Sequence, residues 1–393
     1  MTTAIAAVIP TRDRADLAIA AVRSLLDQDC PIEIFLSDNS VSGERLREYA
    51  RSEPRVHYLR PEHELRMAEH WDWAMRQAME RSPATHFALH YDRKYSKPRR
   101  WQALAAVIAR RPDMLVTYLV DTISDEPPPL RLWQSRWTGR TWLLETARIA
   151  ALVASGRVGD ADQAIPILTN CVVPRAVLES IVDRFGDLCN STSGDACFCS
   201  RFLALHDRFL HFDRPLAVLY APHRSAALGF LSGGGRDYRD WERMWGDRPW
   251  LEAAPVPGLD LGQNMLFHEY ELVRCRTGDR LPPLDRKGCL AELGEALRWV
   301  KEPEKRAALQ KALEVHGWTG TASQFPRRPR LAALRDSSVK ALMRYFGFVP
   351  KSISGFAFAD DAAALDHALK YERRPAGAPD HLAALGLIEL ASS

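Results

Sequence analysis

The segment AIAAVIPTRDR (residues 4–14) decides the fold class. Residues 4–9 are wholly apolar, as expected of a parallel strand that is buried on both faces, and Pro10 breaks the run. Residues 16–27 then place apolar side chains at helical spacing, and residues 32–36 form a second apolar run that ends in turn-forming residues. A strand, a helix and another strand in this order predict a βαβ unit.

The same alternation continues to residue 120. Further strands are expected at 56–59, 85–89 and 114–120, and helices at 44–51, 67–80 and 98–110, where Pro98 stands in the first turn. We therefore expect an α/β fold with a mostly parallel sheet and helices on both faces. Ligands of such sheets bind beyond the carboxyl ends of the strands, so the loops at 10–14, 38–42 and 90–97 should form the site.

The pattern is less regular after residue 120. The stretch 125–137 is expected to be an extended loop, followed by helices at 141–155, 175–185 and 195–205 and by strands at 165–173 and 209–220. The glycine-rich stretch 232–235 is the best candidate hinge, and the chain beyond it has a mainly helical pattern. We expect one unit over residues 1–230 and a helical C-terminal region over residues 236–393.

Composition excludes several classes of protein. A net charge of +3 over 393 residues gives no reason to expect nucleic-acid binding. No apolar stretch approaches the ~18 to 20 residues of a membrane span, and the N-terminal apolar run is too short for a signal peptide. The seven cysteines have no paired spacing, which favours reduced thiols in a cytoplasmic protein.

The first loop lacks both the dinucleotide-binding GxGxxG and the GxxxxGK[ST] phosphate loop. Instead, AVIPTRDR (7–14) and IEIFLSDNS (32–40) resemble the opening of family 2 glycosyltransferases. The resemblance implies a GT-A fold that binds a nucleotide-sugar donor, with residues 1–120 as the nucleotide-binding half and 121–230 as the acceptor half. It places Pro10, Thr11, Arg12 and Asp38 around the nucleotide base.

Elementary chemistry agrees with that placement of Asp38. A carboxylate just past a strand end can accept a hydrogen bond from a base N–H or a ribose hydroxyl. The alternative is that residues 38–40 only form a turn. The segment ELRMAEHWDWAM (64–75) resembles the family's next donor-side loop and helix, with Arg66 where the family has glycine. The alternative there is that Trp71 and Trp73 simply anchor the helix in the core.

The segment FALHYDRKYSKPRRW (87–101) departs most from the family pattern. Family members carry an Asp-x-Asp cluster here, which holds a divalent metal on the donor diphosphate. This chain has Tyr91, Asp92 and Arg93 at those positions, followed by Lys94. We therefore expect no metal cofactor, with Asp92, Arg93 and Lys94 holding the diphosphate directly by ion pairing. The alternative is a basic surface turn.

The segment STSGDACFCSRFLAL (191–205) resembles the acceptor half of the family, in which an acidic residue at the head of a helix is the catalytic base. Asp195 matches that position, and a base is needed because a sugar hydroxyl is a weak nucleophile. The alternative is an acid that only stabilises a helix N-terminus. After the strand at 209–220, the resemblance places His223 and Arg224 in a loop near the diphosphate.

The residues together predict an enzyme that moves a sugar from a nucleotide-sugar donor to a glycan or other acceptor hydroxyl. One base in evidence favours inverting chemistry, in surface-glycan assembly. The altered metal motif leaves open a degenerate, non-catalytic nucleotide-sugar-binding or scaffold protein. A nucleotidyltransferase is disfavoured because no lysine- and glycine-rich nucleotide loop follows the first strand. The basic stretch 327–348 either packs on its own domain, which we favour, or contacts the inner face of the membrane.

Overall fold

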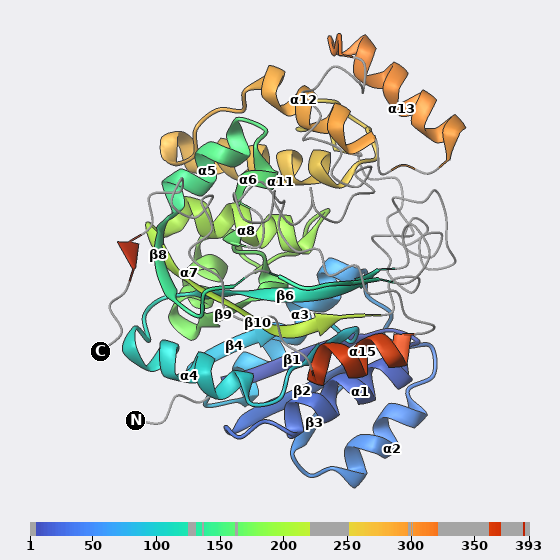
Figure 1. Ribbon diagram of the computed structural model, residues 1–393, viewed down its shortest axis with the longest axis vertical. Coiled ribbons are helices and arrows are strands. Elements are labelled where there is room, and N and C mark those ends of the chain that lie inside the picture. Colours follow the sequence, from blue (N-terminus) through green and yellow to red (C-terminus); the bar gives the residue numbers. More distant parts are fainter. Residues whose placement is uncertain are drawn as a thin grey trace, which may run out of the picture.

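The structure is a computed structural model of the 393-residue chain. It describes residues 5–124, 131–135, 137–161, 164–220, 251–297, 300, 302–320, 361–370 and 388–389. Within them, one mixed sheet lies between layers of helices, and a group of helices packs on one side of it (Figure 1).

The first half of the sheet is parallel. Its strands are β1 (Ile5–Thr11), β2 (Ile32–Asp38), β3 (Val56–Leu59) and β4 (His86–Leu89), arranged in the order β3-β2-β1-β4. The connecting helices are α1 (Ala15–Leu26), α2 (Glu44–Ser52) and α3 (Met67–Arg81). Every residue of β1 is buried because the strand is central and covered on both faces.

Strand β1 shows directly how the two faces are built. Ile5, Ala7 and Ile9 point into one core, which they share with side chains of α1, α2 and α4 (Arg100–Arg110). Ala6 and Val8 point into the other core, which they share with side chains of α3, α7 (Arg175–Phe185) and α8 (Gly194–Leu205). Successive side chains of a strand face opposite sides of the sheet, so one wholly apolar strand serves both layers. The expected α/β fold with helices on both faces is confirmed.

The second half of the sheet is mixed. Strand β9 (Cys171–Pro174) runs antiparallel between β4 and β6 (Val116–Ser124), and β10 (Arg208–Leu219) lies parallel to β6. The edge is made by β8 (Thr141–Glu145) and β11 (Ile388–Glu389), while the short strands β5 (Lys94–Ser96) and β7 (Arg131–Trp133) pair with β10 and β6. Most strands still run in the direction of β1.

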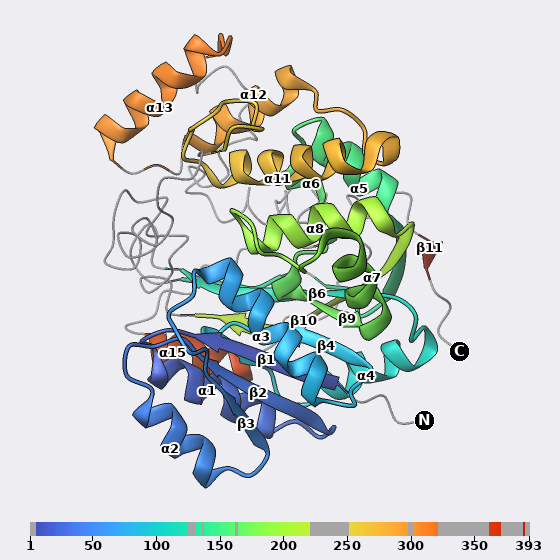
Figure 2. The ribbon, with the colours of Figure 1, turned by 180° about the vertical axis from the view of Figure 1, so that it is seen from behind.

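The chain after residue 250 forms the helical segment that the sequence predicts. Helix α11 (Gly262–Thr277) packs on α8, with α12 (Arg286–Ala296) and α13 (Pro303–Val315) farther from the sheet (Figures 1 and 2). Helix α15 (Asp361–Lys370) instead lies against the sheet, where Ala364 and Ala368 pack with Leu17 and Ile123. The region after the expected hinge thus contacts the first region through several separate elements.

Three sequence expectations differ from the structure. Residues 141–155 are not one helix, because β8 precedes α5 (Thr146–Ala154). The helix expected from Pro98 begins at Arg100, after Arg99 in the left-handed region with φ of 58°. Most of the strand expected at 165–173 is replaced by the short helix η2 (Leu168–Asn170), which leads into β9. The candidate hinge at 232–235 lies outside the described residues.

A search of the described part of the chain for a helix long and apolar enough to span a membrane finds none. The basic stretch 327–348 is outside that part, so its expected packing on its own domain stays a prediction.

Candidate active site

The loops that follow β1 and β2 form one connected unit at the carboxyl edge of the parallel strands. The backbone N–H of Asn39 donates to the Thr11 carbonyl over 2.9 Å, and the backbone N–H of Asp13 donates to Ser40 Oγ over 2.8 Å. Pro10 is buried in β1 beside Ser37 of β2. The two loops that sequence reasoning selected for the nucleotide therefore lie together.

Asp38 is fully buried at the end of β2, and its carboxylate has three hydrogen-bond donors. The backbone N–H of Ser40 lies 2.9 Å from Oδ1, while Tyr58 OH and Arg60 Nη1 lie 2.8 and 3.2 Å from Oδ2. Tyr58 and Arg60 were not selected from the sequence. Their spacing around β3 carries no signal of a site, since the partner carboxylate is about twenty residues earlier.

The entry to α3 is held by reciprocal bonds. Asn39 Nδ2 donates to the Leu65 carbonyl over 2.7 Å, and the Leu65 N–H donates to Asn39 Oδ1 over 3.0 Å. Arg66 follows as the N-cap residue of α3, with its Nε 3.3 Å from Glu69 Oε2. Arg12, in the β1–α1 loop, forms an ion pair with Glu64. Both arginines thus lie near the expected nucleoside side of the site.

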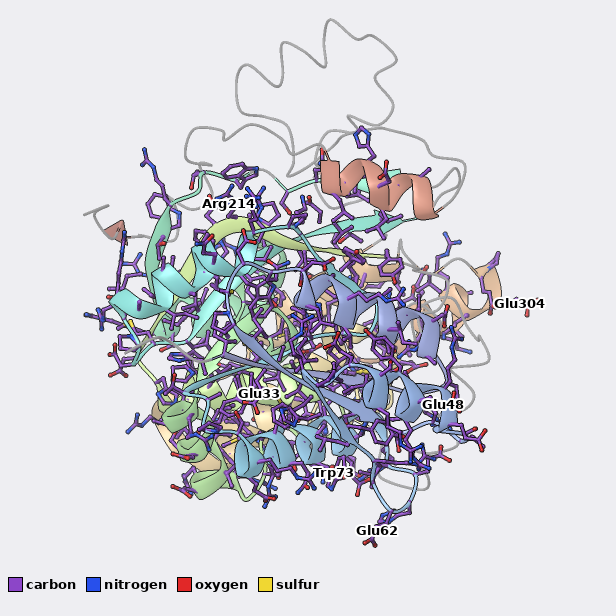
Figure 3. All side chains as sticks on the ribbon, turned by 90° about the horizontal axis from the view of Figure 1, so that it is seen from below. Glu33, Glu48, Glu62, Trp73, Arg214 and Glu304 are labelled. Atoms are coloured by element: carbon purple, nitrogen blue, oxygen red, sulfur yellow. The ribbon has the colours of Figure 1, made fainter. Side chains whose placement is uncertain are left out.

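Trp71 is the aromatic anchor of α3. It is buried and its ring centroid lies 5.5 Å from that of Tyr91. Trp73 is half-buried, stacks on His70 and points from the outer side of α3 (Figure 3). The anchoring interpretation therefore holds for Trp71, and the same residue also supports the site beneath Tyr91.

The segment expected to carry a metal has no spare carboxylate. Asp92 is 2% exposed, and its Oδ2 lies 2.8 Å from Thr11 Oγ1 and 2.9 Å from Arg14 Nε. Arg93 donates from Nη1 to the Tyr220 carbonyl over 3.3 Å. Within the described residues, no group of three or more His, Cys, Asp or Glu side chains gathers as metal ligands would. Hard divalent cations need several oxygen ligands, so these residues do not fit the metal that the family pattern implies.

Asp195, the expected base, is the centre of a polar cluster that we call the Asp195 cluster, made of Tyr91, Lys94, Thr169 and Asp195. Tyr91 OH donates to Asp195 Oδ2 over 2.6 Å. Thr169 donates to Oδ1 from its N–H over 3.2 Å and from Oγ1 over 3.0 Å. The Lys94 ammonium donates to the Thr169 carbonyl. Residues from three separate loops thus meet around one carboxylate.

The surroundings shift both charges of the cluster. Burial raises the pKa of the Asp195 carboxyl above its ordinary value, although the bonds from Tyr91 and Thr169 and the charge of Lys94 oppose the shift. The residue keeps part of its surface open to solvent. Burial lowers the pKa of Lys94 to about 8, against the attraction of Asp195. Lys94 Nζ also lies 5.4 Å from the ring centroids of both Tyr91 and Tyr118.

Close packing fixes the head of α8, where Asp195 lies. A Cβ atom on Gly194 would be 2.9 Å from the Trp71 ring, closer than real Cβ contacts. Helix α8 can therefore approach α3 only because residue 194 is glycine. This contact aligns the first turn of α8, and with it Asp195, beside Tyr91 on the carboxyl side of β4.

The structure brings some of the expected site residues together. Thr11 contacts Asp92, and Lys94 lies with Asp195 in one cluster. No described contact joins Arg12, Asp38 or Arg66 to that cluster, while His223 and Arg224 lie outside the described residues. Sequence reasoning did not select Thr169 or Arg14. Thr169 precedes the pattern used for the acceptor half only as a neutral residue, and Arg14 looked like a helix flank.

A parallel sheet with buried carboxylates and cations at its carboxyl edge is characteristic of enzymes that act on nucleotide-linked substrates. Residues 6–156 match the family model described as Glycosyl transferase family 2, and this part of the chain belongs to that family. The resemblance drawn from the opening segments is thereby confirmed, and the chain is a glycosyltransferase by class.

Solved structures with a similar chain course are distant in sequence. Staphylococcus aureus TarS 1–349 is 14% identical over 78% of this chain and 82% of its own, with a TM-score of 0.43. The same protein in complex with UDP-GlcNAc gives 14% identity, coverages of 78% and 83%, and 0.42. The mannosyltransferase PcManGT from Pyrobaculum calidifontis, in complex with GDP-Man and Mn2+, gives 13%, 80% and 81%, and 0.39. No curated protein matches the sequence.

Proposed function

We propose that this glycosyltransferase moves a sugar from a nucleotide-sugar donor to a glycan hydroxyl during surface-glycan assembly at the cytoplasmic face of the membrane, with Asp195 as the base. The observation that carries the proposal is the Asp195 cluster. It combines a partly exposed carboxylate of raised pKa with a buried lysine, on the carboxyl side of the family 2 sheet. That combination suits the removal of a proton beside a departing diphosphate.

The step is a single displacement. Asp195 takes the proton of the acceptor hydroxyl while its oxygen forms a bond to the anomeric carbon. The bond from that carbon to the donor phosphate oxygen breaks, and the nucleoside diphosphate leaves with the electron pair. One carboxylate acts and no covalent sugar intermediate forms, so the anomeric configuration inverts. Burial favours this chemistry because a carboxylate with a raised pKa is a stronger base.

The leaving diphosphate is neutralised by side chains. Lys94 supplies a positive charge within the Asp195 cluster, and Arg93 and Asp92 frame it from the same loop. Charge-assisted hydrogen bonds can stabilise the developing phosphate charge directly. Because Arg14 and Thr11 already occupy the Asp92 carboxylate, we expect activity to persist in excess chelator. His223 and Arg224 remain expected phosphate contacts.

The nucleoside is placed at the joined loops after β1 and β2. Pro10, Thr11 and Arg12 form one wall, and Arg66 stands at the start of α3. Asp38 has its oxygens occupied by Ser40, Tyr58 and Arg60, so it contributes by holding these groups toward the base as well as by accepting from it.

The proposal is tested with a panel of nucleotide sugars, measuring binding by calorimetry and turnover by release of nucleotide. Asp195→Asn keeps the shape of the side chain and removes its basicity, so turnover should fall by about 10²- to 10⁴-fold with donor affinity retained. Asp183→Asn, on the exposed side of α7, is the matched control and should behave as wild type. A fully active Asp195→Asn variant would place the base elsewhere.

One observation favours a second candidate, a non-catalytic nucleotide-sugar-binding protein. Three hydrogen bonds already reach the Asp195 oxygens, which lowers their capacity to take a proton from an acceptor. Donor binding of ordinary strength without turnover of any donor, in the wild-type protein, would establish this candidate over the enzyme.

A further inference from the structure

We infer that Glu269 of α11, in the helical C-terminal region, is a positioning residue for Asp195. This inference rests on the proposed role of Asp195 as the base. Glu269 does not touch the Asp195 carboxylate in any described contact. It acts through the backbone of residues 191–193, which lead directly into the first turn of α8.

The contacts of Glu269 all converge on that short segment. Its Oε1 accepts from the backbone N–H of Ser193 over 3.0 Å. The backbone of Thr192 and the hydroxyl of Ser191 also form hydrogen bonds with the carboxylate. The side chain is 1% exposed, so no water competes for these donors. A buried carboxylate is costly unless several donors compensate it, and here consecutive residues of one loop supply them.

Glu269 also replaces a missing helix cap. Ser193 is the N-cap residue of α8, but its side chain makes no capping hydrogen bond. The first turn of a helix leaves backbone N–H groups without intrahelical partners and carries a partial positive charge. The carboxylate of Glu269 serves this end from a neighbouring helix. The direction of the first turn of α8, which carries Asp195, is therefore set from α11.

The rest of the loop is tied down by other carboxylates. Asp72 of α3 accepts from the Leu188 N–H over 2.5 Å, and Arg201 of α8 forms an ion pair with Asp187 over 2.6 Å. These contacts hold the start of the loop, and Glu269 holds its end. On the opposite side, the Trp71 ring limits movement of Gly194. The residue before Asp195 is thus fixed between α3 and α11.

Small displacements at this point matter for chemistry. Asp195 must meet Tyr91 and Thr169 at 2.6 to 3.2 Å and the acceptor hydroxyl at a similar distance. A misplacement of about 1 Å in a reacting group can cost about 10²-fold in rate. Donor binding uses the loops after β1, β2 and β4 and does not need the α8 head in register. Loss of Glu269 should therefore lower kcat and leave donor affinity intact.

The test is Glu269→Gln in the full chain, with donor affinity measured by calorimetry and kcat and KM measured separately. Glutamine has nearly the same volume, but one oxygen becomes an NH2 group that faces N–H donors. We expect kcat to fall by about 10- to 100-fold, with the donor Kd changed less than about twofold. Glu269→Asp, a shorter carboxylate, should recover part of kcat; if Glu269→Gln does not fold, this variant alone should show the kcat loss at unchanged Kd.

The control is Asp213→Asn in β10. Asp213 is also a buried carboxylate that accepts from a loop, at the N–H of Thr138 over 2.8 Å, but it does not contact the Asp195 cluster. An equal loss of kcat in this control, or wild-type kcat in Glu269→Gln while Asp195→Asn is inactive, would overturn the inference. Wild-type activity in Asp195→Asn would instead remove the proposed base.

Discussion

At the scale of single residues, two displaced pKa values define the pH range in which the proposed chemistry can operate. Asp195 must be ionised to accept a proton, and its pKa is raised by burial, so activity should fall on acidification at higher pH than for an ordinary aspartate. Lys94 must be charged to neutralise the leaving phosphate, and its pKa is lowered to about 8. We therefore expect a bell-shaped profile of kcat whose alkaline limb lies near pH 8.

Lys94→Met keeps the aliphatic stem and removes the charge. The alkaline limb should disappear and the maximum rate should drop, as measured by initial rates from pH 5 to 10. The sign of the stability effect is opposite: the unfolded lysine holds its proton up to about 10.5. Between about 8 and 10.5 the unfolded state binds more protons, so the wild-type free energy of unfolding should rise with pH there. An alkaline limb that persists in Lys94→Met would assign it to another group.

The sequence contains part of this site and conceals the rest. Asp195 and Lys94 could be selected because each stands in a recognisable segment after a predicted strand or at a helix start. Glu269 could not, since it is one of several acidic residues of a helix and its partners lie some seventy residues earlier in an irregular loop. Thr169 acts through both its backbone and its hydroxyl, and no pattern of residue types marks such a role.

At the scale of elements, the contact between α5 and α12 depends on a pair of glycines. Gly156 follows α5 with φ of 69°, and Gly288 lies in the first turn of α12. A Cβ on Gly288 would overlap the carbonyl of Ser155, and a Cβ on Gly156 would overlap the backbone of Gly288. The backbones can meet this closely only without side chains.

Gly288→Ala should therefore separate the two helices and lower the free energy of unfolding by about 1 to 3 kcal/mol, the usual range for overpacking. Denaturant unfolding measures the change. Gly159→Ala in α6 (Val158–Ala161) is the control, because nothing lies within 4 Å of its added Cβ. Equal stability of the two variants would show that α12 adapts without cost.

Secondary structure was predictable where periodicity was local. The β1–α1–β2 unit follows from its apolar runs alone. Residues 141–145 were assigned to a helix because Leu143 and Leu144 also fit a helical stripe. In the structure only Trp142 and Leu144 are buried, in the alternating pattern of a strand, because β10 pairs with them from some seventy residues farther along. A partner that distant leaves no trace in a local window.

At the scale of the whole molecule, two buried neutral histidines should set the acid limit of stability. His70 bonds to Ser37 Oγ over 2.8 Å, and His90 bonds to the Lys94 carbonyl over 2.9 Å. Burial lowers the pKa of each from 6.5 to about 3. Below pH 6.5 the unfolded chain binds protons that the folded chain refuses, so the free energy of unfolding should fall as pH falls toward 3.

Each histidine should contribute a slope of up to about 1.4 kcal/mol per pH unit over that window. Denaturant unfolding of His70→Gln between pH 7 and 4 should give a shallower slope than wild type. His63→Gln, at an exposed position, should leave the slope unchanged. A slope that His70→Gln does not alter would mean that other groups dominate acid unfolding.

The pairing of β11 with β8 has a consequence for assembly. Ile388 and Glu389 cover the edge of β8 opposite Leu143 and Trp142, across more than two hundred residues of chain. Until that late segment arrives, β8 presents unpaired N–H and C=O groups, which are a template for joining another copy. Contacts so far apart in sequence also form slowly. Newly made chains should therefore pass through a sticky period that ends when β11 adds to the sheet, and a helper that shields β8 during synthesis should raise the yield of monomer.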